Sequence, residues 1–436
     1  MIKKIHRRAG ACSRRKKRGS RRLMKNETMK EKLFYIKDKK MFFVTGQAKG
    51  EPVPNGVYDG VVRRMTDNAK RNEWKNTGRG AMFTGTYTPG TDAASVASSI
   101  RSEVTCVGAF NDNLLFTEQI GGTGAIYRKT SIADMSEVIA FSDTAYSIES
   151  FDTSNTKIAV SASYAHFAHI GTLEPSGRGG VSIITEGESI DKNPSFDKSN
   201  PNVLYYESAG ILLAGEDEPD EPEMMTPAEM MRTMRRMTQT GPSAIVRINF
   251  ATSTLDYILE DENTSYIKPQ TDKDGTLYFI RKPYKDEQPK GEGFLTSLVM
   301  VPVRFFSALG GFFNFFSMKY SGQTLTNNGT RAKGKDEKQI FIDGNLIDAE
   351  KALKENSGEQ NPGIIPKSFE LCRLSGGEIE VVKRGVIAYT FDPDGNVVYS
   401  NGNTIVRINA DGKEERLVND KSAEGVTCLK FIDIDF

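Results

Sequence analysis

Short runs of apolar and β-branched residues alternate with polar positions along most of the chain, and turns rich in Asp and Asn separate them. One unit recurs: an alternating strand, a turn, and a second strand rich in aromatic and β-branched residues. Asp and Asn tolerate the left-handed conformation of tight turns, so each copy predicts a β-hairpin. The copies cover 106–117, 148–161, 193–206, 268–280 and 388–400.

The spacing of these turns predicts the architecture. Successive turns are 41, 45, 75 and 120 residues apart, measured between Asn111, Asp152, Asp197, Asp272 and Asp392. The two short intervals match a four-stranded propeller blade of about 40–50 residues. The two long intervals fit the same period with insertions, which we place at 215–241 and 285–365.

The two ends of the chain are expected to share one sheet. Val426-Thr427-Cys428 repeats Val104-Thr105-Cys106, and the turn residue Asp433 lies 41 positions after Asp392, so the last unit has only its first strand. Sharing a sheet in this way leaves no open sheet edge. The missing strands are expected at 32–37, 41–46 and 56–65.

We therefore predict an all-β fold over 31–436: a six-bladed β-propeller closed by N- and C-terminal strands, with two helical insertions. Residues 66–102 do not fit the period, so a loop or a seventh blade there remains an alternative.

The repeat P-x-F-x-x-D-G-x-Φ-Φ-Y, where Φ is apolar, resembles the repeats of TolB-like β-propellers. It is clearest from Pro194 to Tyr206 and from Phe391 to Tyr399, and the resemblance extends over 103–436. The copies at 106–117 and 148–161 lack the Pro and the Asp-Gly. The resemblance implies six blades and a role as a protein-interaction platform, and it offers no catalytic residue. Some relatives add a serine peptidase domain, but no G-x-S-x-G motif occurs here.

Charge divides the chain into a basic head and an acidic body. Residues 1–32 hold 14 basic and 2 acidic residues, and the remainder holds 44 basic and 55 acidic residues. The head, 1–30, lacks apolar residues that would offset ordering entropy, so it is expected to be disordered. A mis-assigned translation start accounts for it, since Met24 and Met29 precede the first strand. A tail that binds RNA or anionic lipid is the alternative.

No signal peptide is expected, because no apolar segment follows the basic residues. The four cysteines, at 12, 106, 372 and 428, show no metal-binding spacing. We expect a cytoplasmic protein, peripheral at the inner face of the membrane if it contacts lipid, with no cofactor and no metal.

The first insertion contains a predicted helix that begins at Thr226-Pro227, with Glu229 at capping-box spacing. An adaptable methionine face suits docking of a protein partner, and packing on the propeller is the alternative. The face consists of Met230, Met231, Met234 and Met237.

The second insertion holds the most apolar segment of the chain, 294–316, which is long enough to span a membrane. We expect no span, because the segment interrupts one blade and the chain must return on the same side. Its exposed face would meet lipid in the plane of the membrane, a partner, or the methionine face. This face consists of Phe305, Phe306, Leu309, Phe312, Phe313 and Phe316.

The predicted function is a noncatalytic scaffold that binds a protein partner, a membrane surface, or both through these two faces. Nucleic acid is not an expected partner, and the sequence leaves the oligomeric state open. The alternative is a propeller enzyme, a lyase or hydrolase of a sugar or lactone, with polar residues converging on the central channel. His166 and His169 are expected on opposite faces of a strand rather than at a metal. Asp272-x-Asp274-Gly275 and Asp392-x-Asp394-Gly395 resemble calcium loops but are predicted to be hairpin turns.

Overall fold

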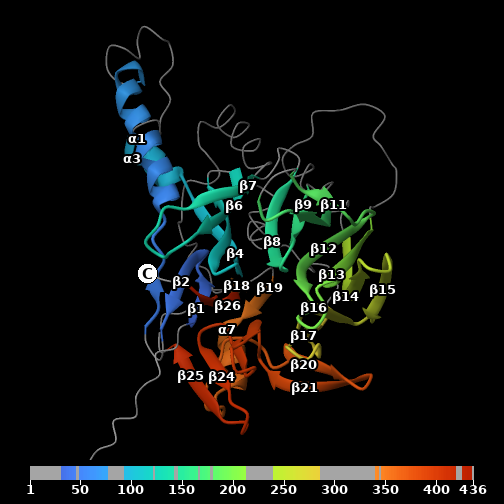
Figure 1. The fold of residues 1–436 in the computed structure, drawn as a ribbon. Helices are drawn as coiled ribbons and strands as arrows, with labels where there is room; N and C mark the ends of the chain where they lie inside the picture. The colour runs from blue at the N-terminus through green and yellow to red at the C-terminus, as the bar shows by residue number, and fades with distance from the viewer. Residues whose placement is uncertain are drawn as a thin grey trace, which may run out of the picture.

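The protein is described by a computed structural model. The described residues are 31–45, 49–76, 93–120, 123–141, 146–164, 167–176, 180–212, 239–284, 339–342, 345–418 and 425–434. Most of them lie in antiparallel sheets, and a helical pair projects from one side (Figure 1). The prediction of a β-sheet protein is confirmed at this level.

Across the described residues the strands form four sheets of four strands, one of eight and one of two. The eight-stranded sheet has two halves, which meet in parallel where Ala168 pairs with Ile190. Its first half is β8 Ser147–Thr153, β9 Ile158–Ser163, β10 Ala168–Leu173 and β11 Ser182–Ile183. Its second half is β12 Ser189–Phe196, β13 Val203–Leu212, β14 Gln239–Asn249 and β15 Thr254–Leu259.

Three of the four-stranded sheets are antiparallel meanders in chain order, and in one of them an insertion separates the second strand from the third. The sheet before the eight-stranded one contains β4 Ser102–Phe110, β5 Asn113–Ile120, β6 Thr123–Lys129 and β7 Glu137–Phe141. The sheet after it contains β16 Thr264–Thr271, β17 Leu277–Pro283, β20 Glu370–Ser375 and β21 Glu378–Arg384. The next contains β22 Ala388–Phe391, β23 Val397–Ser400, β24 Ile405–Ile408 and β25 Glu414–Val418.

The predicted hairpins are present at all five repeats, and their turns behave as the residue types require. In the first, Phe110 pairs with Asn113, and Asn111 and Asp112 adopt φ of 47° and 59°. Such positive φ angles match the twist of a two-residue hairpin turn. The same left-handed conformation is taken by Gly395 (φ 88°) in the β22–β23 turn.

The aspartates of two later turns accept hydrogen bonds from backbone amides. Oδ1 of Asp272 accepts hydrogen bonds from the N–H groups of Asp274 (3.0 Å) and Thr276 (2.9 Å). Oδ1 of Asp392 accepts one from the N–H of Asn396 at 2.8 Å. Both segments are hairpin turns, as predicted, and their carboxylates close the turns.

The C-terminal strand pairs with the first strand of the described chain, the pair that the sequence led us to expect. Strand β26 Cys428–Asp433 runs antiparallel to β1 Glu31–Lys37, with Leu33 opposite Phe431. The same sheet continues through β2 Lys40–Val44 to the short β3 Glu51–Pro52. Phe34, Leu429 and Ile432 are buried at this junction.

The prediction of a strand at 56–65 is wrong, because this stretch begins the helix α1 Gly56–Asn76. Oδ1 of Asn55 accepts a hydrogen bond from the N–H of Tyr58 at 3.1 Å, which caps the first turn. The described part of 66–102 is also helical, through the rest of α1 and α3 Ala93–Ser99, which packs on α1. At 66–76 and 93–99 the structure therefore has helices, where the sequence left a loop or a seventh blade open.

The two predicted insertions, 215–241 and 285–365, remain predictions; in chain order they lie around the segments that join β13 to β14 and β17 to β20. Residues 239–241 belong to β14, so the first insertion ends before that strand. The described part of the second insertion contains a β-hairpin, β18 Gln339–Ile342 with β19 Asn345–Asp348, and the helix α7 Ala349–Glu355. The remaining residues of both insertions, including every predicted helix in them, lie outside the described residues.

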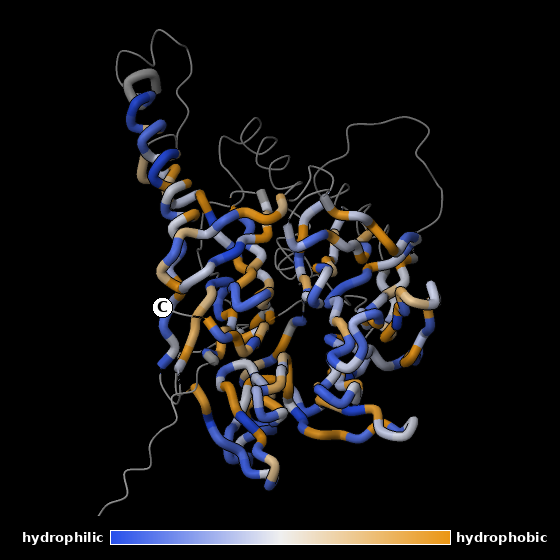
Figure 2. Tube along the Cα trace, in the orientation of Figure 1, coloured by the Kyte–Doolittle hydropathy of each residue, from blue (hydrophilic) through white to orange (hydrophobic). Residues whose placement is uncertain are grey.

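The first strands of neighbouring sheets contact one another. Contacts join β26 to β4, β4 to β8, β8 to β12, β12 to β16, and β22 to β26. Two hydrogen bonds join β16 to β22. Nε2 of Gln270 donates to the carbonyl oxygen of Tyr389 at 3.1 Å, and the Tyr389 hydroxyl donates to the carbonyl oxygen of Lys268 at 2.8 Å. Apolar and polar residues alternate along the strands (Figure 2), so the apolar side chains of adjacent sheets pack between them.

Candidate functional site: an acidic pocket beside strand β12

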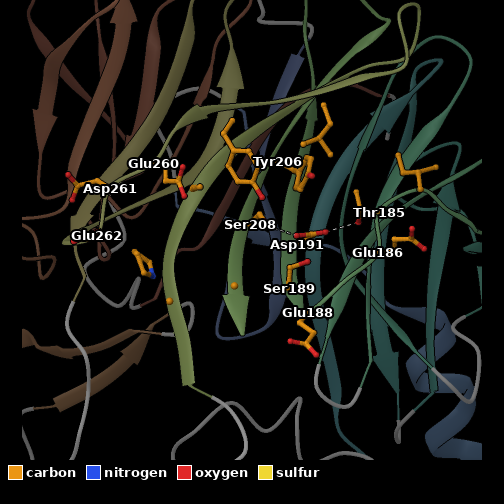
Figure 3. A pocket seen from close by; sticks show the side chains of 17 residues that line it. Thr185, Glu186, Glu188, Ser189, Asp191, Tyr206, Ser208, Glu260, Asp261 and Glu262 are labelled. Carbon is orange, nitrogen blue, oxygen red and sulfur yellow. Dashed lines mark hydrogen bonds between the residues drawn. The ribbon is translucent and has the colours of Figure 1, made fainter. Parts of the chain in front are cut away.

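A pocket of about 630 Å³ lies between the segment that follows β11 and the strands β12 to β15. Asp191 on β12 lies in this pocket, and its side chain is almost completely buried. Its Oδ2 accepts a hydrogen bond from Oγ1 of Thr185, and its Oδ1 accepts one from Oγ of Ser208, both at 2.6 Å (Figure 3). These bonds give both oxygens of the buried carboxyl group a hydrogen-bond partner.

The pocket has a strongly negative lining. Six carboxyl groups line it, and no Lys, Arg or His is found among its described lining residues. The acidic residues are Glu186, Glu188, Asp191, Glu260, Asp261 and Glu262, which Figure 3 shows on both sides of the pocket. Such uncompensated charge favours a cationic ligand.

Four of these carboxylates are available to a ligand. Within the described part of the chain, the carboxylates of Glu186, Glu188, Glu260 and Glu262 form no ion pair or hydrogen bond, and all four residues are exposed. Asp261 is different, because its Oδ1 accepts a hydrogen bond from the N–H of Asn263 at 2.8 Å. That bond holds the turn between β15 and β16 and lowers the pKa of Asp261.

Apolar side chains lie at the edge of the same pocket. Leu255 and Tyr257 on β15 are 51% and 61% exposed, and Ile184 is 38% exposed. Tyr206 lies deeper: burial, and then the negative charge of Asp191, raise the pKa of its phenol, so it stays protonated. The pocket therefore offers both apolar contact and negative charge to a ligand.

A second group of charged side chains links three of the first strands. Asp152 on β8 lies 3.1 Å from Nζ of Lys198 and 3.2 Å from Nζ of Lys430 on β26. Its Oδ2 also accepts a hydrogen bond from the N–H of Phe196 on β12 at 2.9 Å. A further pair joins Glu149 on β8 to Lys192 on β12 at 3.4 Å.

The pKa values in this ion-pair cluster follow from burial and mutual attraction. Burial opposes ionisation of Asp152, but Lys198, Lys430 and the Phe196 N–H outweigh it and lower its pKa to about 2. Asp152 in turn raises the pKa of Lys430. Burial, together with the positive charge of Lys430, lowers the pKa of Lys198 although Asp152 acts to raise it. Each charge is thus held by an opposite charge, which is the arrangement of a structural cluster.

The predicted binding residues cannot be placed with these sites. Both the methionine face, Met230 to Met237, and the phenylalanine-rich face, Phe305 to Phe316, lie outside the described residues. Of the two histidines considered above, His166 also lies outside them. His169 lies on β10, with Nδ1 3.9 Å from Oδ2 of Asp191.

Sequence reasoning missed both the acidic pocket and the ion-pair cluster. Asp152 was used only as a turn marker, although its carboxylate reaches a neighbouring sheet. The run Glu260-Asp261-Glu262, just before a strand, was the available signal for the pocket. In the described part of the chain, no three His, Cys, Asp or Glu side chains are grouped to hold a metal ion. None of the described helices is both long and apolar enough to cross a bilayer.

Comparison with known proteins yields structural likeness only. No family model matches the chain, and no curated protein matches it. TolB from Acinetobacter baumannii is similar over 75% of this chain and 57% of that chain, with 11% identity and a TM-score of 0.42. A nidogen/laminin complex is similar over 92% and 98%, with 9% identity and a TM-score of 0.44. A putative 6-phosphogluconolactonase from Bacteroides uniformis is similar over 92% and 99%, with 8% identity and a TM-score of 0.40.

This chain spans little more than half the length of the TolB structure. The TM-scores are all below 0.5, so these likenesses carry no conclusion about activity or ligand. The chain is a mostly β protein of antiparallel sheets, and the solved structures similar to it include TolB proteins and other propeller folds.

Proposed function

We propose that the chain forms a closed, six-bladed β-propeller that works as a noncatalytic binding scaffold. Support comes from the sheets, which divide into six groups of four strands when the eight-stranded sheet is counted as its two halves. The contacts between first strands run from β26 through β4, β8, β12, β16 and β22 back to β26. A shared sheet between the two ends of the chain would remove the open edges of the ring.

The partner that fits this scaffold best is a protein segment that carries Lys or Arg beside an apolar residue. One observation carries this proposal: the pocket beside β12 combines six carboxyl groups with the exposed Leu255 and Tyr257. Single exposed ion pairs contribute only about 0.2–1 kcal/mol each. Several carboxylates around one concave site, next to apolar surface, would give a basic and partly apolar segment an advantage over a purely basic one.

Short fluorescein-labelled peptides test this proposal by fluorescence anisotropy on the full chain. Three peptides are compared: one with Lys, Arg and Leu, one with the same charges and Ser in place of Leu, and one with Glu in place of Lys and Arg. We expect the first to bind most tightly, the second more weakly and the third not at all. Equal binding of the basic and acidic peptides would rule out the pocket as a site for cations.

The two apolar faces predicted from sequence remain a separate proposal, supported by their composition alone. In this proposal Met230 to Met237 and Phe305 to Phe316 dock a partner or the cytoplasmic membrane surface. The test is flotation of the full chain with liposomes, compared with a variant in which the five Phe residues of the second face are Ser. Unchanged flotation would remove the membrane version.

An enzyme that acts on a sugar or lactone remains the alternative function. The observation in its favour is the grouping of the charged side chains of Asp152, Lys198 and Lys430, since the expected signature of this alternative is polar residues that converge on the central channel. Turnover of a sugar lactone by the purified chain, abolished in Lys198→Gln, would replace the scaffold by this alternative.

A further inference from the structure

Two cysteines that are far apart in sequence lie together where the C-terminal strand meets β4. Cys106 is buried on β4, and Cys428 is half-buried on β26. Both Sγ atoms lie 3.9 Å from the carbonyl oxygen of Val107, and Cys428 packs against the apolar cluster that contains Cys106. The two thiols are therefore neighbours across the contact between two sheets.

An irregularity in β4 accompanies this placement. The pairing of β4 with β5 shifts its register between Val104 and Cys106, which is a β-bulge or a similar irregularity. A bulge changes the direction in which the following side chains project. Thr105, at the shift, donates its hydroxyl to the carbonyl oxygen of Glu149 on β8 at 2.6 Å. Cys106 comes directly after this anchored residue.

The surroundings favour a thiolate at Cys428. The Cys106 thiol lies beside it and donates to the carbonyl oxygen of Phe151 at 3.5 Å, and the ammonium groups of Lys268 and Lys430 add positive charge near Cys428. Against the opposing effect of burial, these groups lower the pKa of Cys428 to about 7, and that of Cys106 is raised well above its ordinary value. A thiolate, rather than a thiol, is the nucleophile in cysteine chemistry.

We propose that Cys106 and Cys428 form a redox-active dithiol whose substrate is a peroxide and whose product is a disulfide between β4 and β26. The Cys428 thiolate attacks one oxygen of hydrogen peroxide, the O–O bond breaks, and hydroxide leaves and takes a proton to become water. This gives a sulfenic acid at Cys428. The Cys106 sulfur then attacks Sγ of Cys428, the S–O bond breaks, and the second water leaves with the thiol proton. Two thiols are oxidised and one peroxide is reduced to two waters.

The disulfide would tie the strand at the end of the chain to a sheet whose sequence lies more than 300 residues earlier. Because the closed loop is so long, the entropic contribution to stability is expected to be large. Oxidation should raise the melting temperature by several degrees and slow any opening of β26. The inference does not depend on the acidic pocket.

The test is stoichiometric peroxide treatment of the full chain, followed by thiol counting and peptide mapping by mass spectrometry. We expect a linked peptide pair that contains Cys106 and Cys428, reversed by dithiothreitol, while Cys372 stays reduced. Cys372 is an internal control, because burial raises its pKa to about 11. Oxidation of Cys428 to a sulfinic acid without linkage, equal reaction at Cys372, or links only between molecules would each overturn the proposal.

The variant Cys106→Ala separates the two steps. It removes the second thiol, so peroxide should leave a sulfenic acid at Cys428 that a dimedone probe labels, with no disulfide. The pH midpoint of Cys428 alkylation by iodoacetamide should also shift to higher pH, because the neighbouring Cys106 thiol, which lowers the pKa of Cys428, is lost. An unchanged midpoint would contradict the role assigned to Cys106, and the wild-type peptide map remains decisive if the variant folds poorly.

Discussion

Carboxylates are held in opposite ways in two regions of this molecule. In the ion-pair cluster, the buried carboxylate of Asp152 contacts two ammonium groups and one backbone N–H. These groups compensate its negative charge. In the acidic pocket, Glu186 and Glu260 are exposed and have no partner among the described residues. The cluster joins sheets that are distant in sequence, and the pocket leaves charge available to a ligand. The comparison separates residues that stabilise the fold from residues that can bind.

The largest expected effect concerns the strand that joins the two ends of the chain. Removing residues 426–436 deletes β26 and takes the buried Leu429, Ile432 and Ile434 out of the core. Each such side chain contributes about 1.5–3 kcal/mol, so their sum approaches the total stability of a typical domain. We expect loss of the cooperative thermal transition in circular dichroism.

The matched control removes residues 1–28, which the sequence predicts to be disordered, and should leave the melting temperature unchanged. A truncated chain that still melts cooperatively at the wild-type temperature would show that β26 does not complete the fold.

The next effect concerns the ion-pair cluster. Asp152→Asn leaves Lys430 and Lys198 without their counter-charge, and breaking a buried pair in this way costs about 3–5 kcal/mol. The free energy of unfolding, measured in urea, should fall by that amount. The control Glu350→Gln removes an exposed pair with Lys354 and should not change it measurably.

Acid should distinguish the same two variants. The folded-state pKa of Asp152, about 2, lies below its ordinary value of 3.8. The stability that Asp152 contributes is therefore fully present above about pH 4 and is lost as the pH falls toward 2. Wild-type stability should decline across this window more steeply than that of Asp152→Asn. If the free energy of unfolding depends on pH in the same way in the wild type and in Asp152→Asn, this result would contradict the ion pairing of Asp152.

A smaller effect is expected in the pocket, on binding and not on stability. Glu186→Gln, Glu188→Gln and Glu260→Gln together remove three exposed carboxylates that have no partner in the described chain. At about 0.5 kcal/mol each, the basic peptide should bind roughly tenfold more weakly in the anisotropy assay. The melting temperature should not fall, because no described contact is lost. A triple variant that is less stable but binds the peptide with unchanged affinity would show that these carboxylates stabilise the fold and do not bind the ligand.

The smallest effect is expected at the apolar edge of the pocket. Tyr257→Ser removes a ring that is 61% exposed, so it should weaken binding of the basic, Leu-containing peptide by about twofold to threefold. The Ser-containing basic peptide should bind this variant and the wild type equally. An equal loss for both peptides would place Tyr257 outside the apolar contact.

Local signals were sufficient for the hairpins but not for every element. Asn111 and Asp392 mark turns because their chemistry is local, so the repeats could be read from spacing. The prediction of a strand from Gly56 to Met65 is wrong, because its apolar residues fit both the two-residue period of a strand and the 3.6-residue period of a helix. The helix cap at Asn55 is the signal that the strand prediction left out.

Apart from the acidic run at 260–262, neither charged region has a signal in the sequence, since both depend on tertiary arrangement. Asp152 and Lys430 are 278 residues apart, and the packing of β26 against β4, and of β4 against β8, brings them together. The pocket depends on the β12–β13 register, which places Ser208 opposite Asp191. The Phe-rich segment, which the sequence singled out most clearly, lies outside the described residues.

The most direct test of the binding account is to locate a bound peptide by photocrosslinking. A basic, Leu-containing peptide with a photoreactive group is irradiated with the full chain, and the crosslinked residues are mapped by mass spectrometry. Binding in the acidic pocket predicts crosslinks at residues 184–188 and 255–262 that disappear with excess unlabelled peptide. Competable crosslinks concentrated instead at Lys192, Lys198 or Lys430 would contradict it.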